Sequence, residues 1–307
     1  MDEIVLQTNG LTKYFGEKPA VDHLDLKIPK GSVCGFLGRN GAGKTTAIRM
    51  MTGMLKPTQG SCSVLGCDCQ ELTPQIRQRI GYVTEGHRLF RWMKIAELEK
   101  FQKSFFSKQW DDRLFNDMIE YFDLSKKQKI KNLSNGQRAQ VSLALTLAPN
   151  PELLIMDDPT LGLDVVIRRQ FLEGIIQLIT RQGRTILFSS HILGDVERVA
   201  DRIVVIDKGV LKADCTIEQF RSAISKFVFT FEKQIPCEIN IDGLLHWRSD
   251  GNFLEAVLIN TSEQTVQKWA ETIGAKEYKE IEMNLEDEFI EFTLPDKKKR
   301  FFDWEKN

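Results

Sequence analysis

The order of apolar and polar positions along the chain is typical of an α/β fold. Up to about residue 214, short apolar runs alternate with longer segments of helical periodicity, and polar or glycine-rich residues follow each run at once. The clearest runs are residues 33–37, 80–84, 153–156 and 185–189. Such runs predict buried strands of a mostly parallel sheet, and ligands bind at the carboxyl ends of strands in sheets of this kind.

A helical insertion is predicted between about residues 88 and 150. Leu98, Phe101 and Phe105 recur at helical spacing, and a second apolar helix ends at the Pro-Asn-Pro sequence of residues 149–151. This segment therefore interrupts the strands of the sheet with helices of its own.

The strand pattern restarts after a predicted β-hairpin, in which residues 203–206 and 210–211 flank an Asp-Lys-Gly turn. Later strands are predicted at residues 227–231, 254–259 and 278–283, and a helix is predicted at residues 262–273. We therefore predict a first domain of residues 1–220 and a small α+β accessory domain of residues 221–307.

Charge and hydropathy exclude several classes of protein. The chain has 42 Lys and Arg residues against 43 Asp and Glu residues, so its near-neutral balance gives no electrostatic reason to bind nucleic acid. No stretch approaches the roughly 18 to 20 apolar residues that a membrane-spanning helix needs. The acidic start also lacks the order of a signal peptide. We therefore expect a cytoplasmic protein without a nucleic-acid partner.

A phosphate-binding loop follows the first of these apolar runs. Its spacing, in which four residues separate a glycine from Gly-Lys-Thr, is that of a P-loop between a strand and a helix. Backbone N–H groups and the helix dipole would bind ATP phosphates, Lys44 would reach the β and γ phosphates, and the Thr45 hydroxyl would bind Mg²⁺. The predicted nucleotide-binding residues here are Gly38, Arg39, Asn40, Gly41, Ala42, Gly43, Lys44, Thr45 and Thr46.

Two acidic residues end the apolar run at residues 153–156. A buried strand there would deliver Asp157 to the Mg²⁺ shell beside the P-loop and point Asp158 toward the attacking water. Taken alone, the same letters equally describe a strand followed by a helix-capping aspartate. The P-loop upstream favours the metal-binding interpretation.

A second candidate phosphate site is the sequence Leu-Ser-Asn-Gly-Gln at residues 133–137. Ser134 is placed to cap a helix that runs from Arg138 to about Ala148, and the N–H groups of a first helical turn can hold phosphate. An ordinary capped helix is an equally good interpretation of this pentapeptide by itself.

These motifs together resemble the ABC ATPase family. The segments GRNGAGKTT, LSNGQ and LLIMDDPTLGLD, followed by Ser190 and His191, occur in this order between residue 1 and about residue 214. The resemblance implies a P-loop NTPase core with a mostly parallel sheet, an antiparallel β subdomain and a helical insertion. It also implies ATP and Mg²⁺ as ligands.

The resemblance assigns further roles residue by residue. Tyr14 matches the aromatic that stacks on adenine, Asp164 matches the D-loop aspartate, and His191 matches the switch histidine that senses the γ phosphate. Glu85 stands in the glutamine loop, with roles in catalysis and Mg²⁺ binding beside the catalytic Asp158. From the residues alone, a core histidine and an exposed aromatic are common alternatives. The signature, which contacts the ATP of the opposite subunit, is matched by Ser134, Asn135, Gly136 and Gln137.

Partners follow from the same resemblance. It implies a head-to-tail pair with a second ABC ATPase subunit, as a homodimer or a heterodimer. It also implies an integral membrane permease that binds the helical insertion and the loop near Glu85, and residues 86–93 are the candidate for that contact. Chain length, the GLDVVIRRQF segment and residues 285–290 resemble bacterial export-type subunits with a single motor domain. The chain is accordingly expected on the inner face of the cell membrane, held there by the permease.

Departures from the family pattern bear on rate. Asp158 stands where a glutamate is expected, and a carboxylate about one ångström out of place can cost around a hundredfold in rate. Glu85 replaces the usual glutamine and adds negative charge, while Asn135 replaces a signature glycine but tolerates positive φ. We therefore expect slow hydrolysis and intact phosphate binding at the signature.

Two other classes of function are compatible with a P-loop. A binding switch would close on ATP, hydrolyse little and regulate a partner other than a permease. A P-loop kinase or helicase would need neither the LSNGQ segment nor the LGLD sequence after the acidic pair. We favour the transport ATPase because a single P-loop is present and no long coiled-coil insertion is visible.

Overall fold

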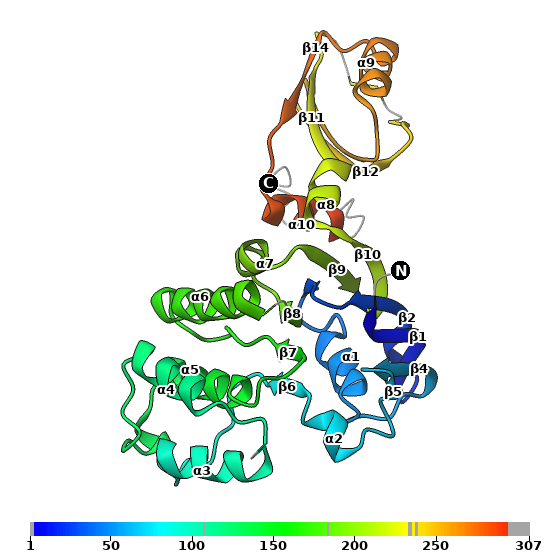
Figure 1. Ribbon diagram of the computed structural model, residues 1–307. Helices are drawn as coiled ribbons and strands as arrows, with labels where there is room; N and C mark the ends of the chain where they lie inside the picture. Colours follow the sequence, from blue (N-terminus) through cyan, green and yellow to red (C-terminus); the bar gives the residue numbers. More distant parts are fainter. Residues whose placement is uncertain (1–2, 107, 183, 233–234, 237–238, 294–307) are drawn as a thin grey trace. The chain divides into compact units, whose positions relative to one another are not determined.

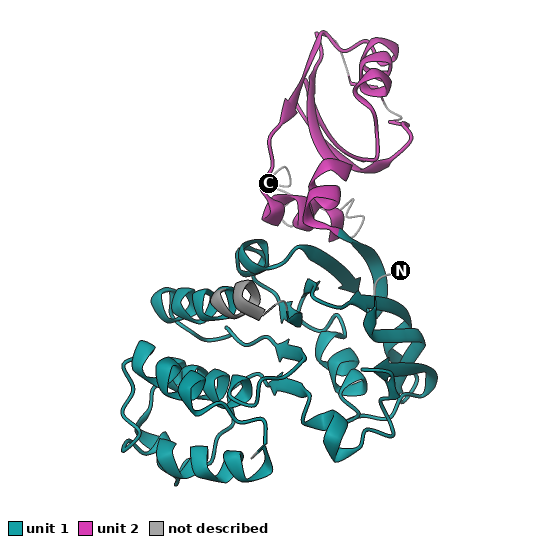
Figure 2. Cartoon of the chain, viewed as in Figure 1, with its two compact units in different colours: residues 1–215 teal, residues 216–307 magenta. Residues whose placement is uncertain are grey.

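The computed structural model describes residues 3–106, 108–182, 184–232, 235–236 and 239–293 (Figure 1). The chain divides into two compact units, Met1–Cys215 and Thr216–Asn307, which are coloured separately in Figure 2. Unit 1 contains two sheets and unit 2 contains one, and each unit has its own hydrophobic core.

Unit 1 is built on a six-stranded sheet with the strand order β10-β9-β3-β8-β7-β6. β3 pairs in parallel with β8 and β9, and β7 pairs in parallel with β6 and β8, which confirms the predicted α/β fold. All residues of β3, β7 and β8 are buried, as their apolar sequences require. The strands are β3 (Val33–Leu37), β6 (Ile80–Val83), β7 (Leu153–Asp157), β8 (Thr185–Ser190), β9 (Arg202–Asp207) and β10 (Val210–Thr216).

A second, four-stranded antiparallel sheet of unit 1 has the order β2-β1-β4-β5. It shares one hydrophobic core with the parallel sheet and helix α1 (Lys44–Met51), in which Leu6, Leu24, Phe36 and Ile48 are fully buried. This common core fixes the start of α1, and so the P-loop, against both sheets. The strands are β1 (Ile4–Phe15), β2 (Lys18–Pro29), β4 (Gln59–Val64) and β5 (Cys67–Asp68).

The predicted insertion is helical in the structure. The helical spacing of apolar residues correctly predicts α3. Of the three residues that define this spacing, Leu98 is buried, whereas Phe101 and Phe105 are 40% and 56% exposed. The second predicted helix begins already at Asn135, not at Arg138, because the side chain of Ser134 caps it there. The elements are α3 (Ile95–Phe105), α4 (Asp112–Tyr121), a 3-10 turn (Ile130–Asn132) and α5 (Asn135–Leu147).

Of the remaining helices of unit 1, α6 (Val165–Gln182) and α7 (Leu193–Val199) connect strands of the parallel sheet, and α2 (Pro74–Arg77) lies between β5 and β6. Within the described residues, no helix has both the length and the apolar character needed to cross a bilayer.

Unit 2 contains a four-stranded antiparallel sheet with the order β12-β13-β11-β14. Helix α9 covers one face of it, where Trp269 packs edge-to-face on Phe229 with ring centroids 4.8 Å apart. The three strands predicted here are present, and β12 was missed. The elements are α8 (Ile217–Ala223), β11 (Ile224–Thr230), β12 (Leu244–Asp250), β13 (Phe253–Ile259), α9 (Glu263–Thr272), β14 (Glu277–Ile281) and α10 (Leu285–Thr293).

The structural division between the units falls before α8, whereas the sequence placed the domain boundary at residue 220, inside that helix. Phe220 of α8 is buried and packs edge-to-face on Phe292 of α10, with ring centroids 5.4 Å apart. This aromatic contact joins α8 to the second unit.

Candidate functional site

The P-loop connects the carboxyl end of β3 to the start of α1. Gly43, the N-cap of α1, has a φ of 107°, and a Cβ there would lie 2.3 Å from the carbonyl oxygen of Ala20. Only glycine fits this close approach of two backbone segments. Since no side chain caps α1, the N–H groups of its first turn are left for an anion.

Lys44 points into the loop that precedes it. Its Nζ donates a hydrogen bond of 2.8 Å to the carbonyl oxygen of Gly38 and lies 3.6 Å from Oδ2 of Asp158. The Lys44 side chain is only 5% exposed, so its charge depends on these partners or on a bound phosphate.

Asp157, the last residue of β7, meets the start of α1. The hydroxyl groups of Thr45 and Ser189 donate hydrogen bonds of 3.1 Å and 3.0 Å to its Oδ1. Burial raises the pKa of this carboxyl, and the two hydroxyl donors oppose that shift. A carboxylate and a hydroxyl side by side are hard oxygen donors that fit Mg²⁺.

This donor set is small, as expected for Mg²⁺ that is bound largely through phosphate oxygens and water. Across the described residues, no group of three or more His, Cys, Asp and Glu side chains is arranged to hold a metal ion by itself. Thr45 and Asp157 would therefore hold Mg²⁺ only together with a bound nucleotide.

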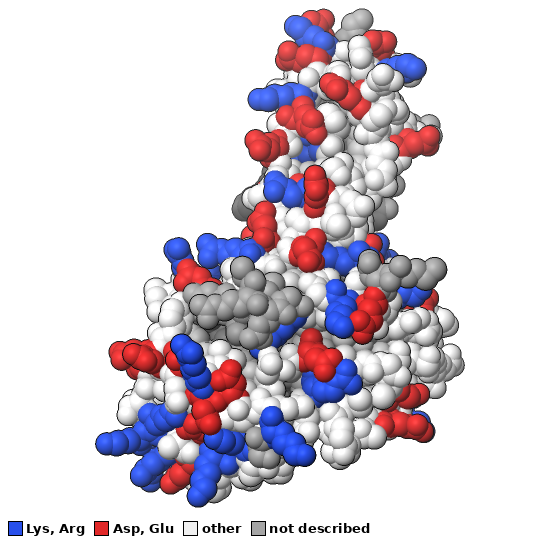
Figure 3. All heavy atoms as spheres, in the orientation of Figure 1, with Lys and Arg blue, Asp and Glu red and all other residues white. Residues whose placement is uncertain are grey.

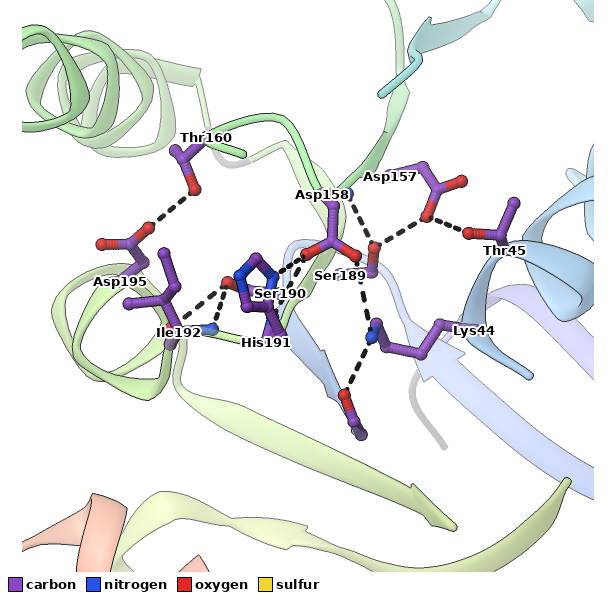
Figure 4. Close-up of polar contacts among 11 residues, drawn as sticks. Lys44, Thr45, Asp157, Asp158, Thr160, Ser189, Ser190, His191, Ile192 and Asp195 are labelled. Carbon is purple, nitrogen blue, oxygen red and sulfur yellow. Dashed lines mark hydrogen bonds and ion pairs between the residues drawn. The ribbon is translucent and has the colours of Figure 1, made fainter. Parts of the chain in front are cut away.

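Asp158 bridges the P-loop lysine and the histidine that follows β8. Oδ1 of Asp158 lies 2.9 Å from Nδ1 of His191 and accepts a 3.2 Å hydrogen bond from the His191 backbone N–H, while Oδ2 faces Lys44. Figure 4 shows the carboxylate between the two side chains. The φ of Asp158 is 42°, a left-handed conformation that aspartate tolerates better than most residues. Asp158 and His191 meet because β7 and β8, which they follow, are adjacent parallel strands whose carboxyl ends lie at the same edge of the sheet.

The LSNGQ segment forms the capped start of α5. Ser134 and Gln137 form a reciprocal capping box, with hydrogen bonds of 3.1 Å and 3.0 Å, and Asn135 bonds to Arg138. A Cβ on Gly136 would lie 2.7 Å from Cγ2 of Ile167, so glycine lets α5 approach α6. The contacts that the structure describes for this segment are local or reach α6, and none joins it to the P-loop cluster.

Other predicted site residues surround this centre with fewer contacts. Glu85 is exposed just after β6, and its charge helps to raise the pKa of Asp157. Asp164 caps α6, accepting hydrogen bonds from the backbone N–H groups of Val166 and Ile167. Tyr14 lies at the end of β1, half-buried, and donates its backbone N–H to Thr58. Arg39, Asn40 and Gly41 are exposed, and Ala42 and Thr46 lie beside them at the start of α1.

His87 does not belong to an exposed contact surface, contrary to its inclusion in the candidate permease contact at residues 86–93. The side chain is buried, with Nε2 2.8 Å from the carbonyl oxygen of Pro159 and the ring near Phe171. Burial lowers the pKa of His87, which favours a neutral ring that donates from Nε2. Sequence gives no sign of this contact, because its partners are 72 residues apart.

Ser189 and Asp195 contact residues of this site and are not indicated by the sequence motifs. Ser189 donates to Asp157 and accepts a 2.9 Å hydrogen bond from the Asp158 backbone N–H, so it holds both acidic residues. Asp195 accepts a hydrogen bond from Thr160. The sequence feature that could have indicated Ser189 is its position near the carboxyl end of a predicted buried strand.

Comparison with known proteins finds similarity to ATP-binding proteins of ABC transporters. A family model described as "ABC transporter" matches residues 21–161. The bacitracin transport ATP-binding protein BcrA of Bacillus licheniformis is 31% identical over 73% of this chain and 74% of its own length. The uncharacterized ABC transporter ATP-binding protein YhcH of Bacillus subtilis is 30% identical over 94% of this chain and 96% of its own length.

A further relative and two solved structures are also ATP-binding proteins or cassettes. The daunorubicin/doxorubicin resistance ATP-binding protein DrrA of Streptomyces peucetius is 32% identical over 73% of this chain and 68% of its own length. The crystal structure of a nucleotide-free ATP-binding cassette from an ABC transporter is similar at a TM-score of 0.59 and 26% identity, covering 70% of this chain and 93% of that one. A dimeric cassette in a post-hydrolysis state, bound to ADP and Pi, shares the fold at a TM-score of 0.62 and 22% identity, covering 69% of this chain and 98% of that one.

Proposed function

The chain belongs to the family of ABC transporter ATP-binding proteins, and from that premise we propose that it is the ATP-hydrolysing motor subunit of an exporter. In this proposal, Mg-ATP is bound and hydrolysed at the interface of a head-to-tail dimer, and a separate membrane permease carries the solute. The observation that carries the proposal is the Asp158 carboxylate between Lys44 and His191, beside the Asp157 and Thr45 oxygen donors.

Each residue of this centre has a chemical role in the proposal. The P-loop N–H groups and Lys44 bind the phosphates, and Thr45, Asp157 and Glu85 supply oxygen ligands. Bound Mg²⁺ neutralises charge on the phosphates during transfer. Asp158 accepts the proton of the attacking water, and His191, oriented by Asp158, contacts the γ phosphate. Tyr14 stacks on the adenine.

The signature supports pairing of two such subunits. In the capped helix start of residues 134–137, Ser134 and Asn135 are exposed, Gln137 is half-exposed and Gly136 is buried. The contacts described for this segment do not reach the P-loop of the same chain. A second ABC ATPase subunit, identical or homologous, would receive this segment against its own ATP. Asp164, exposed just before α6, would lie at the same interface.

An exposed aromatic surface on the helical segment supports a permease contact. Phe90, Trp92, Phe101 and Phe105 are 40% to 68% exposed, and Phe90 and Phe101 meet edge-to-face with ring centroids 5.7 Å apart. Exposed aromatic residues of this kind are typical of protein interfaces. Arg88 and Arg91 are exposed in the same segment, whereas the buried His87 is excluded from the contact.

Two further observations support an exporter that lies at the inner face of the membrane: the names of related proteins and the positive charge of one surface. Relatives named for bacitracin transport, drug resistance and Nod factor export support an exporter. In Figure 3, Lys and Arg side chains gather over the lower left of the chain, the region of α3 and α4 in Figure 1. Lys127, Lys129 and Lys131 are exposed after α4. Basic residues of this kind are attracted to the anionic lipids of the cytoplasmic face of a membrane.

Replacing Asp158 with glutamate is expected to speed ATP hydrolysis by about tenfold to a hundredfold, because the added methylene moves the carboxylate closer to the attacking water. The measurement is steady-state phosphate release at saturating Mg-ATP. Asp112→Glu, which lengthens an exposed acid paired with Lys103, is the matched control. An Asp158→Glu chain no faster than the parent would show that carboxylate length does not limit the rate.

The proposal as a whole is tested by phosphate release from the purified chain across protein concentration, with ATP binding measured in parallel. A rate that rises faster than linearly with protein and requires Mg²⁺ supports a self-pairing motor. Tight ATP binding without turnover, even with a homologous subunit and permease added, would favour the second candidate, an ATP-dependent switch. This second candidate is supported by Asp158, whose side chain is shorter than the expected glutamate and is therefore expected to slow hydrolysis.

A further inference from the structure

A buried carboxylate links two loops of the candidate site. Asp195, in the first turn of α7, is 4% exposed. Its Oδ2 accepts a hydrogen bond of 2.7 Å from the Thr160 hydroxyl, and its Oδ1 lies 3.5 Å from Nε of Arg168. Figure 4 shows the contact with Thr160 at one side of the site. A buried charge with two well-placed partners is costly to leave unpaired, so these contacts hold their loops firmly.

The two partners of Asp195 lie at the two ends of the turn that contains Asp164. The carbonyl oxygen of Thr160 accepts a hydrogen bond from Leu163, and that of Asp164 accepts one from Arg168. Asp164 also caps the start of α6. The segment of residues 160–168 is thus internally bonded, and one carboxylate holds both its beginning and its end.

The other side of the link carries His191. The Ser190 hydroxyl accepts a 2.9 Å hydrogen bond from the Ile192 N–H, and the Ile192 carbonyl oxygen accepts one from the Asp195 N–H. Residues 190–195 therefore form a compact turn in which His191 and Asp195 are fixed relative to each other. Any displacement of this turn changes the distances from Asp195 to Thr160 and Arg168.

We propose that Asp195 is a positioning residue that couples the turn containing Asp164 to the turn carrying His191, so that the two segments open and close together. This coupling rests on the proposed function, in which Asp164 faces the partner subunit and His191 faces the γ phosphate. Through Asp195, arrival of the partner subunit at Asp164 is transmitted to the residue that contacts the reacting phosphate. In this proposal Asp195 acts only through its contacts with Thr160 and Arg168.

Hydrogen–deuterium exchange on the full chain without nucleotide tests the coupling directly. Arg168→Gln and Thr160→Val each remove one partner of Asp195. Either change is expected to raise amide exchange about tenfold both in residues 160–168 and in residues 190–195, because Thr160→Val loses a hydrogen bond to a charged group and Arg168→Gln loses a partly buried ion pair. Arg169→Gln is the matched control, because Arg169 is 67% exposed and pairs at the surface with Glu173 on its own helix.

Conservative variants separate coupling from general destabilisation. Thr160→Ser keeps the hydroxyl and is expected to retain parental exchange in both segments. Asp195→Asn keeps an acceptor for Thr160 and loses the charge that faces Arg168. It is expected to lower kcat about tenfold, with ATP affinity changed less than about twofold. Thermal unfolding of every variant identifies any that fail to fold, and Thr160→Val against Thr160→Ser then decides the result.

The coupling is overturned if Arg168→Gln and Thr160→Val loosen residues 160–168 and leave residues 190–195 at parental exchange. It is equally overturned if Arg169→Gln loosens both segments to the same extent. Failure of the proposed function looks different: the parent chain, with its partners present, would not hydrolyse ATP. Exchange in the two segments still decides the coupling in that case.

Discussion

A Lys44→Met chain is expected to bind Mg-ATP at least about a hundredfold more weakly than the parent, because charge-assisted hydrogen bonds to phosphate are lost. The side chain is buried and its Nζ points into the P-loop, where it bonds the carbonyl oxygen of Gly38. Methionine preserves most of the buried volume, so the loss isolates the ammonium group. Isothermal titration calorimetry with Mg-ATP measures the affinity.

The matched control for this change is Lys30→Met. Lys30 pairs with Glu3 at 2.7 Å, but its side chain is 58% exposed, and exposed ion pairs of this kind contribute little. The control chain is expected to bind ATP as the parent does. Parental affinity in the Lys44→Met chain, with unchanged thermal unfolding, would contradict the placement of the phosphates at the P-loop.

Replacing Asp158 with asparagine is expected to lower ATP hydrolysis by about a hundredfold to a thousandfold, because an amide cannot accept the proton of the attacking water. ATP binding is expected to persist and to tighten several-fold. In the structure, Asp158 lies 3.6 Å from Lys44, so its charge competes with phosphate for that ammonium group. Single-turnover hydrolysis and calorimetry on the same sample measure both effects.

Asp112→Asn is the control for the Asp158 change, since Asp112 forms an exposed pair with Lys103 away from the site. It should leave rate and affinity unaltered. Hydrolysis by the Asp158→Asn chain at the parental rate would exclude Asp158 as the base. Weaker ATP binding would show that Asp158 supports the P-loop lysine and does not compete for it.

Sequence predicted the parts of the fold that short segments encode. Strands β3, β7 and β8 are rich in apolar residues because both faces of each strand are buried, and this makes them recognisable without any partner. The sequence does not indicate strand β12, because the strand ends in the exposed polar residues Arg248, Ser249 and Asp250, and its assignment depends on pairing with β13. The spacing of the aromatic residues of α3 predicts a helix, but it does not predict which face of that helix is buried against the rest of the protein.

Sequence by itself predicted the P-loop, a helix capped by Ser134 and the acidic pair at the end of β7, because each is built from residues that are neighbours in the chain. Tertiary structure alone decided that Asp158 lies between Lys44 and His191, that His87 is buried against Pro159, and that Asp195 meets Thr160. The last two contacts join residues 72 and 35 positions apart. They exist because the order of the parallel strands brings the loops after β6, β7 and β8 to one edge of the sheet, and a linear pattern does not contain that order.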